Sequence, residues 1–223
     1  MTIRPVLVVG GGIGGMAAAL ALAQAGFPVT VLEQSAEIGE IGAGIQLGPN
    51  AFTAMDALGL GERARKRAVY IDELVMHDAL DASLVARIPV GEPFRQRFGN
   101  PYAVIHRADI HLSIYEEVQL DKRVQVYTST RVENIELLPD GVRLTDQNGK
   151  TFEGSALVGA DGGRSTARKF LVGDGHRVSG HVVYRAVVPR DEFPKDLSWN
   201  AASIWVGPNY HLVHYPLRGG EMY

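Results

Sequence analysis

The first thirty residues combine apolar runs with a cluster of glycines. From Pro5 to Ala23 no residue is charged or strongly polar, Arg4 lies just before this run, and five glycines between positions 10 and 15 interrupt it. Glycine destabilises a helix interior by roughly 1 kcal/mol, so one membrane-spanning helix is a poor interpretation of this run. The pattern predicts a buried strand over 3–9, a helix over 13–25 and a second buried strand over 28–32.

Shorter periodic segments follow as far as residue 118. Pro49 and Asn50 are typical of a helix start, and apolar residues at helical spacing mark a longer helix that begins at Arg107. The elements expected in this part are a glycine loop over 35–44, helices over 49–58, 60–67 and 107–118, strands over 69–79 and 83–89, and a loop over 90–101.

The second half of the chain favours strands. Pro139, Asp140 and Gly141 separate two alternating runs and predict a hairpin over 131–146. The other elements expected here are strands over 124–127, 155–159, 181–188, 201–206 and 210–216, and a short helix over 165–171. Together these elements predict an α/β protein with two domains. The first, over 1–172, is a Rossmann-like α/β domain with β-rich insertions, and 173–223 begins a second, mostly antiparallel sheet.

Composition narrows the classes of function. Hydrophobic residues make up 46% and charged residues 21% of the 223 residues, which is typical of a globular protein. The net charge of −3 is unlike that of a nucleic-acid-binding protein. Cysteine is absent, which excludes disulfides, thiolate metal sites and cysteine nucleophiles. We expect a cytoplasmic protein without a membrane span.

The glycine cluster satisfies the dinucleotide-binding pattern G-x-G-x-x-G in its structural context. It follows an apolar strand and opens a helix, whose N-terminus favours a pyrophosphate. Glu33 lies 23 residues after Gly10, at the end of the second strand, where a carboxylate can accept hydrogen bonds from ribose hydroxyls. The pattern does not distinguish NAD from FAD, and a plain glycine turn beside a solvated Glu33 is the alternative. The predicted nucleotide-binding residues are Gly10, Gly12, Ile13, Gly14, Gly15 and Glu33.

A second motif carries a family resemblance. Residues 157–165 read Leu-Val-Gly-Ala-Asp-Gly-Gly-Arg-Ser and are followed by Arg168. The segment resembles the Asp-Gly motif of the flavoprotein aromatic hydroxylases, which are single-component FAD monooxygenases. The resemblance implies FAD as the cofactor, with Asp161 beside its pyrophosphate and beside the path of the NADH co-substrate.

The same resemblance assigns three further residues. Arg107 matches the arginine at a helix start that reaches the flavin, and Val132 matches the position whose backbone meets the adenine. Gln46 belongs to residues 41–47, which are similar to the segment that passes along the isoalloxazine. Taken alone, Asp161 could lie in a plain turn, Arg107 on a helix surface and residues 41–47 in an ordinary glycine loop.

Residues 205–220 resemble the branch of this family that acts on 3-hydroxybenzoate or salicylate. The resemblance implies a small aromatic acid, molecular oxygen and NADH as substrates. The product would be gentisate from 3-hydroxybenzoate or, with decarboxylation, catechol from salicylate. A non-catalytic FAD- or NAD-binding module is a further alternative. A dehydrogenase fits less well, because nothing after Glu33 continues a regular α/β nucleotide fold.

Strand geometry separates the histidines of this segment. Side chains alternate along a strand, so His211 and Tyr215 share a face, whereas His214 points the other way. A zinc site formed by His211 and His214 is therefore not expected. The resemblance makes His211 the base beside the substrate phenol and places Tyr215 in the same pocket. The alternative is that both are ordinary half-buried strand residues.

The resemblance covers a little over half of the family's usual length. The later Gly-Asp motif of the family, which holds the ribityl chain of the flavin, lies outside this sequence. We therefore expect an N-terminal fragment that is poorly soluble alone, binds FAD weakly and does not turn over substrate. The sequence is compatible with an oligomer but does not specify one.

Overall fold

The computed structural model describes residues 4–39, 42–174 and 177–223. The chain divides into two compact units. Unit 1 comprises Met1–Glu40 and His111–Val183, and unit 2 comprises Ile41–Ile110 and Tyr184–Tyr223. Residues 41–110 thus group with the C-terminal segment, while the domain boundary expected at residue 172 stays a prediction.

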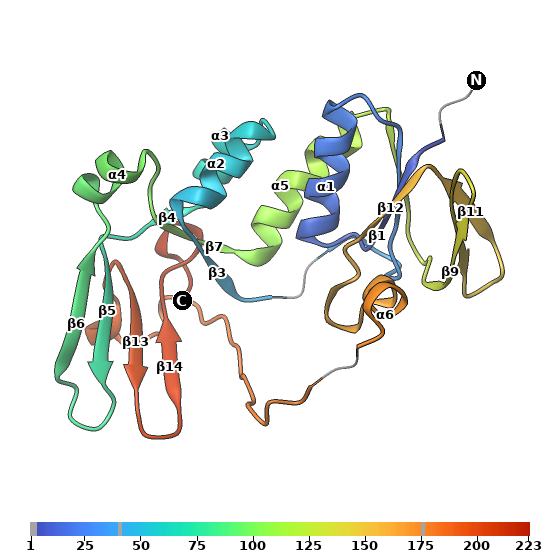
Figure 1. Cartoon of the computed structure of the whole chain (residues 1–223). Coiled ribbons are helices and arrows are strands. Elements are labelled where there is room, and N and C mark those ends of the chain that lie inside the picture. The colour runs from blue at the N-terminus through green and yellow to red at the C-terminus, as the bar shows by residue number, and fades with distance from the viewer. Residues whose placement is uncertain (1–3, 40–41, 175–176) are drawn as a thin grey trace. The chain divides into compact units, whose positions relative to one another are not determined.

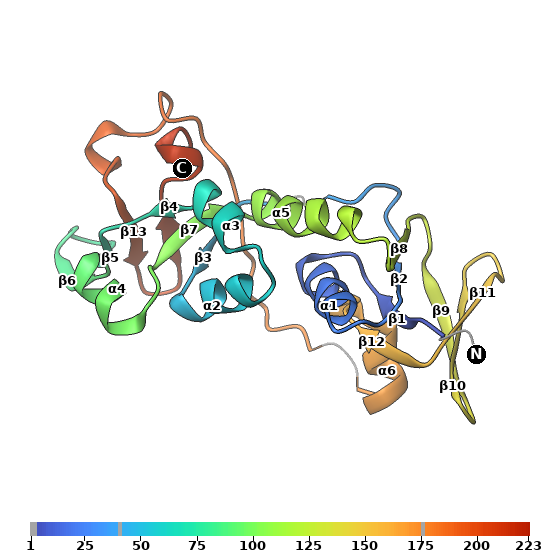
Figure 2. The same cartoon turned by 90° about the horizontal axis from the view of Figure 1, so that it is seen from above.

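Unit 1 is built on a four-stranded parallel sheet (Figures 1 and 2). Every residue of its two central strands is buried, which explains why both read as continuous apolar runs. Helix α1 (Ile13–Gln24) connects these two strands and packs against the sheet, so the predicted strand–helix–strand unit is confirmed. In spatial order the strands are β12 (Ala156–Gly159), β1 (Val6–Val9), β2 (Val29–Leu32) and β8 (Val124–Tyr127).

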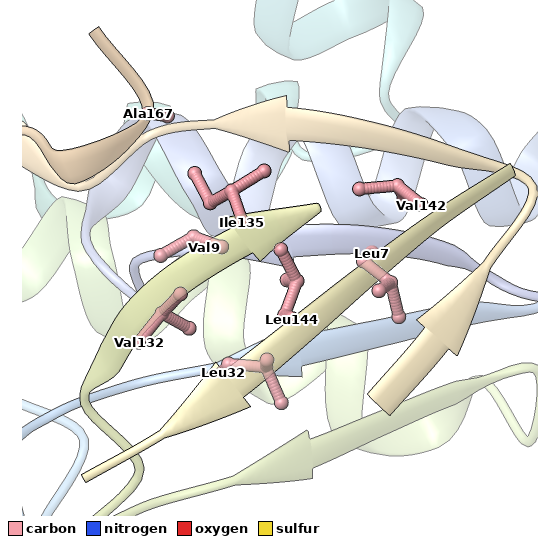
Figure 3. Packing of buried hydrophobic residues seen from close by; sticks show 8 residues of the cluster. All are labelled: Leu7, Val9, Leu32, Val132, Ile135, Val142, Leu144 and Ala167. Carbon is pink, nitrogen blue, oxygen red and sulfur yellow. The ribbon is translucent and has the colours of Figure 1, made fainter. Parts of the chain in front are cut away.

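An antiparallel three-stranded sheet supplies the second layer of unit 1. Its first turn lies at Pro139 and Asp140, as the hairpin prediction required. Leu7 and Val9 point to the same side of β1, because they are two residues apart, and they meet apolar side chains of this second sheet (Figure 3). The sheet consists of β9 (Val132–Leu138), β10 (Gly141–Asp146) and β11 (Thr151–Gly154). The shared core contains Leu7, Val9, Leu32, Val132, Ile135, Val142, Leu144 and Ala167.

Two further helices complete unit 1. Helix α5 (Arg107–Leu120) belongs to unit 1 from His111 onward and lies beside α1 in both views (Figures 1 and 2). It buries Ile110, Ile114 and Val118, which recur every four residues. The predicted helix is confirmed and is two residues longer than expected. Helix α6 (Thr166–Val172) follows β12 and contributes Ala167 to the core.

The described residues of unit 2 form two sheets and three short α-helices, besides two 3-10 helices and the start of α5. The larger sheet is mostly antiparallel, as predicted, and only its two central strands run parallel. It takes two strands from the middle of the chain and two from the C-terminal segment. In spatial order its strands are β14 (His211–His214), β13 (Ala201–Val206), β5 (Glu73–Asp78) and β6 (Leu84–Pro89). The smaller sheet has the order β3 (Gly44–Leu47), β7 (Ala103–His106) and β4 (Val69–Tyr70). The helices are α2 (Pro49–Ala57), α3 (Gly61–Arg67) and α4 (Glu92–Phe98).

One face of the larger sheet carries a cluster of histidine and tryptophan rings. His77 stacks on Trp205 at 4.4 Å between ring centroids and on Trp199 at 5.6 Å. The indole N–H of Trp205 donates to Nε2 of His214 at 3.0 Å, so the proton of this imidazole sits on Nδ1. Burial, together with the nearby His77, lowers the pKa of His214.

Three elements expected from the sequence are wrong. The single strand expected over 69–79 is two strands, β4 and β5, which belong to different sheets. Residues 90–101 are not a loop, since helix α4 occupies their centre. Residues 181–188 form no strand, although all of them are described, and only Val188 at the end pairs, by two backbone hydrogen bonds with Tyr223. A strand needs a partner as well as a β-forming sequence, and the described chain offers none to this segment. Among the described residues, no helix is long and apolar enough to cross a bilayer.

We predict that Leu144→Ala lowers the free energy of unfolding by about 2–5 kcal/mol, because Leu144 is fully buried between the two sheets of unit 1. Leu137→Ala in the same hairpin is the matched control, since Leu137 is 72% exposed. Its effect should stay within about 0.5 kcal/mol. Urea unfolding of both variants measures the difference, and equal losses would contradict this core.

We also predict a pH effect from His214. Because its pKa is lowered in the folded protein, the unfolded chain takes up a proton first, below about pH 6.5. The free energy of unfolding should therefore fall as the pH drops from 7 to 5. His214→Gln keeps an acceptor for Trp205 but cannot titrate, so its stability should fall less steeply. His181→Gln, at an exposed histidine, is the control, and an unchanged slope in His214→Gln would refute the assignment.

Candidate functional site

The glycine turn after β1 is closed so tightly that two of its residues must be glycine. Gly10 has a φ of +103°, and a Cβ atom there would lie 2.3 Å from the Ala160 carbonyl oxygen. A Cβ atom at Gly15 would lie 1.8 Å from the carbonyl oxygen of Gly10. At these two glycines the backbones of β1, α1 and β12 approach one another closely, where the two parallel strands end.

The N-terminus of α1 opens from this turn without a side-chain cap. Gly12 is the N-cap residue, and the first turn contains no acidic residue. A Cβ atom at Gly14 would meet nothing within 4 Å, so the helix start has open space beside it. The first amide N–H groups of a helix have no partner within the helix and attract an anion. Gly12, Ile13, Gly14 and Gly15 therefore form the kind of N-terminus that accepts a diphosphate.

Glu33 is brought to the glycine turn by β2. Its Oε2 accepts a hydrogen bond from the Gly11 amide at 2.5 Å, and its Oε1 accepts one from the Ser35 amide at 2.7 Å. A carboxylate has about four acceptor positions, so two remain for hydroxyl groups. The structure thus places the acid and the glycines together, as the motif predicted.

Val132 is the first residue of β9, and the chain just before it is hydrogen-bonded to Glu33. The Thr130 amide donates to the Glu33 carbonyl oxygen at 2.8 Å, two residues before Val132. The side chain of Val132 is buried in the core, which leaves only its backbone for contact with a ligand. Val132 also borders an open hollow of about 550 Å³ between β9 and α6.

Asp161 has structural partners that the motif did not reveal. Its carboxylate accepts hydrogen bonds from the Ser165 hydroxyl at 2.5 Å and from the Thr166 amide at 2.6 Å, at the start of α6. Arg168, the next residue of the motif, forms an ion pair with Asp174. Asp161 therefore orders the start of α6, and its contact with a cofactor stays a prediction.

His111 is a residue of this site that the sequence did not single out. It lies on α5, is only 2% exposed, and its Nε2 is 2.7 Å from the Gly11 carbonyl oxygen. The sequence could have indicated this residue, because its helical spacing places His111 on the apolar side of the helix, with Ile114 and Val118. A polar residue on that buried side needs a partner.

Arg107 lies in unit 2, at the start of α5. Its amide donates to the Ala43 carbonyl oxygen at 3.0 Å. A Cβ atom at Gly42 would lie 3.1 Å from Cβ of Arg107, so the loop before β3 packs on the stem of the arginine. A Cβ atom at position 42 would therefore require the stem of Arg107 to shift by a few tenths of an ångström.

Gln46 lies on β3, and its side chain is exposed. Its Oε1 accepts a hydrogen bond from the Tyr102 hydroxyl at 2.5 Å. Burial raises the pKa of Tyr102, so its phenol keeps this proton at neutral pH. Gln46 is therefore held by a neutral donor within unit 2.

His211 and Tyr215 have different surroundings in unit 2. His211 is exposed on β14 and pairs with Val206 of β13. Tyr215 follows the strand and is half-buried against the core of the unit, where burial raises its pKa. A Cβ atom at Gly44 would lie 2.2 Å from Cε2 of Tyr215, so the ring occupies the space that glycine leaves. Strand alternation predicted that His214 points away from the face of His211, and His214 contacts Trp205 of the tryptophan cluster.

The described residues contain no group of three or more histidine, aspartate or glutamate side chains that could hold a metal ion. The predicted site residues divide between the two units. Unit 1 brings together the glycine turn, Glu33 and Val132, and this set fits a dinucleotide with a diphosphate and an adenosine ribose. Gln46, Arg107, His211 and Tyr215 belong to unit 2.

Comparison with known proteins agrees with this geometry. Residues 4–192 match the family model described as FAD binding domain. The 3-hydroxybenzoate 6-hydroxylase of Polaromonas naphthalenivorans (strain CJ2) is 68% identical over 219 residues, which are 98% of this chain and 55% of that protein. The 3-hydroxybenzoate 6-hydroxylase of Klebsiella oxytoca is 53% identical over 97% of this chain and 55% of its own length. The chain thus spans about half the length of these relatives.

A solved structure shares the fold. A variant of HpxO from Klebsiella pneumoniae, solved in complex with FAD, superimposes with a TM-score of 0.81. The match covers 99% of this chain and 56% of that protein, at 24% sequence identity. At this identity the likeness supports the fold.

We predict that Glu33→Gln weakens FAD binding about 10- to 100-fold. Hydrogen bonds to a charged group contribute roughly 1.5–3 kcal/mol, and an amide cannot accept with both of its terminal atoms. Quenching of flavin fluorescence measures the dissociation constant. Glu37→Gln is the matched control, because Glu37 is exposed four residues further along the same loop. Equal affinity in the Glu33 and Glu37 variants would argue against a ribose contact.

Proposed function

This chain belongs to the FAD binding domain family, and from that premise we propose that it serves the hydroxylation of 3-hydroxybenzoate to 2,5-dihydroxybenzoate, gentisate. The observation that carries the proposal is the 68% identity to a 3-hydroxybenzoate 6-hydroxylase across 98% of the chain. Because the chain spans 55% of that relative, the activity is proposed for a protein of the relative's length.

The proposed reaction consumes one NADH, one proton and one O₂ for each 3-hydroxybenzoate. It yields gentisate, NAD⁺ and one water, so one oxygen atom enters the ring and the other is reduced to water. When bound, FAD supplies the oxidation–reduction chemistry that links NADH to O₂. We place the reaction in the cytoplasm.

In unit 1, the proposed role of the chain is to bind the ADP half of FAD. The N-terminus of α1 receives the diphosphate, and the free acceptor positions of Glu33 receive the ribose hydroxyls. The backbone of Val132 meets the adenine, and Asp161 approaches the pyrophosphate from the start of α6. These roles are supported by the geometry of the turn and by the family resemblance.

In unit 2, Tyr215 and His211 are proposed to contact the aromatic acid in different roles, Tyr215 as a hydrogen-bond donor and His211 as a base. Burial raises the pKa of Tyr215, so its phenol stays protonated at neutral pH and can donate a hydrogen bond. It is therefore unsuited to be the base. An imidazole can accept a proton near neutral pH, and His211 is proposed to take the phenolic proton of the substrate, which makes the ring a better nucleophile. Gln46 and Arg107 are proposed to flank the flavin.

A chimera tests the proposal. Residues 1–223 replace the matching N-terminal part of the Polaromonas naphthalenivorans relative, and the purified chimera is offered 3-hydroxybenzoate or salicylate with NADH. We expect a yellow protein that forms gentisate in proportion to the NADH oxidised. Catechol from salicylate would favour the decarboxylating reaction instead. Bound FAD without any product, while the unmodified relative is active, would leave only a nucleotide-binding function.

We predict that His211→Asn slows turnover of the chimera about 10²–10⁴-fold, the usual effect of losing a positioned base. FAD should remain bound, and the rate should partly recover at high pH, where the substrate phenol ionises unaided. His181→Asn removes an exposed histidine elsewhere and should leave the rate unchanged. A near-normal rate in His211→Asn with a flat pH response would eliminate His211 as the base.

A further inference from the structure

His111 is a buried imidazole with a backbone partner in the glycine turn. Only 2% of the residue is exposed, and Nε2 lies 2.7 Å from the carbonyl oxygen of Gly11. A carbonyl oxygen can only accept, so Nε2 carries the proton and donates it. The bond joins α5 to the turn across 100 residues of sequence.

The partner residue is held at both of its polar atoms. The carbonyl oxygen of Gly11 accepts from His111, while its amide donates to Oε2 of Glu33 at 2.5 Å. Gly11 has no side chain to restrict its backbone, and a Cβ atom there would come within 3.0 Å of Cβ of Glu33. The orientation of Gly11 is therefore set by two side chains from distant elements.

The same bond determines where the next amide points. The peptide unit between Gly11 and Gly12 is planar and trans, so the carbonyl oxygen and the Gly12 N–H point in opposite directions. Fixing the oxygen on His111 aims the Gly12 N–H away from α5. Gly12 is the N-cap of α1, at the end of the helix that attracts an anion.

We propose that His111 is a positioning residue for FAD, because it aims the Gly12 amide at the diphosphate. The proposal rests on the FAD binding proposed above. His111 itself touches no part of the cofactor, and its contribution passes through the peptide unit that it holds. Glu33, which accepts from the Gly11 amide, is proposed to bind the ribose hydroxyls instead.

Three substitutions test this role in the full chain. His111→Gln places an amide N–H about where Nε2 lies and should keep FAD affinity within about twofold. His111→Asn ends one bond short of that position, and His111→Leu has no donor. The latter two should weaken FAD binding roughly 3- to 10-fold, the usual effect of one lost hydrogen bond. Flavin fluorescence quenching gives the affinities, and thermal unfolding shows that each variant is folded.

Competing nucleotides separate positioning from general damage. His111→Asn and His111→Leu should raise the dissociation constant of ADP about as much as that of FAD but leave the dissociation constant of adenosine unchanged, because only ADP carries the diphosphate. A turn that is merely destabilised would weaken both. Equal loss for ADP and adenosine, or unchanged FAD affinity in both variants, overturns the role of His111. If His111→Leu does not fold, the comparison of the Gln and Asn variants still decides.

The proposed function fails in a distinguishable way. If neither the unsubstituted chain nor the chimera described above binds FAD or ADP, the FAD site is refuted and the positioning role with it. If the unsubstituted chain binds FAD and all three His111 variants bind it equally well, the site stands and His111 has no part in it.

Discussion

The close approach of Gly10 to Ala160 is the constraint on which unit 1 depends. A Cβ atom at position 10 would lie only 2.3 Å from the Ala160 carbonyl oxygen, so no other residue fits between β1 and β12. The φ of +103° at Gly10 independently requires glycine. Gly15 imposes the same condition on the start of α1. Because the strands and the helix meet at this point, the open N-terminus of α1, the acid at the end of β2 and the start of α6 all lie around one turn.

The parts of the fold that the sequence predicted well are those in which local pattern and tertiary contact agree. The apolar runs of β1 and β2 are buried throughout, and Pro139 and Asp140 form the expected turn. Helix α4 was missed although its signals were present, with Pro93 near its start and Gly99 in the left-handed conformation at its end. The segment 181–188 shows the opposite error, since β-propensity cannot supply a partner strand.

The site residues also divide into those that a motif predicts and those that only the packing of the fold identifies. The glycines and Glu33 form a motif with fixed spacing, so the sequence could bring them together. Asp161 was recognised by its motif, but its bonds to Ser165 and Thr166 depend on where α6 begins. His111 carries no motif at all. Its partner is the Gly11 carbonyl oxygen, a backbone atom that every residue has, and only the packing of α5 identifies it.

Because the orientation of the turn depends on the packing of distant elements, a glycine-rich pattern alone is weak evidence for a nucleotide site. Glycines permit a tight turn but leave its peptide units free to rotate. Here Gly11 is held by Glu33 from the end of β2 and by His111 from α5, and Ser35 fixes the second oxygen of Glu33. The donors and acceptors of the turn are thus oriented by contacts within unit 1, and such preorganisation reduces the conformational entropy lost on binding. The recognition geometry is a property of the packed unit, and the motif supplies only the room for it.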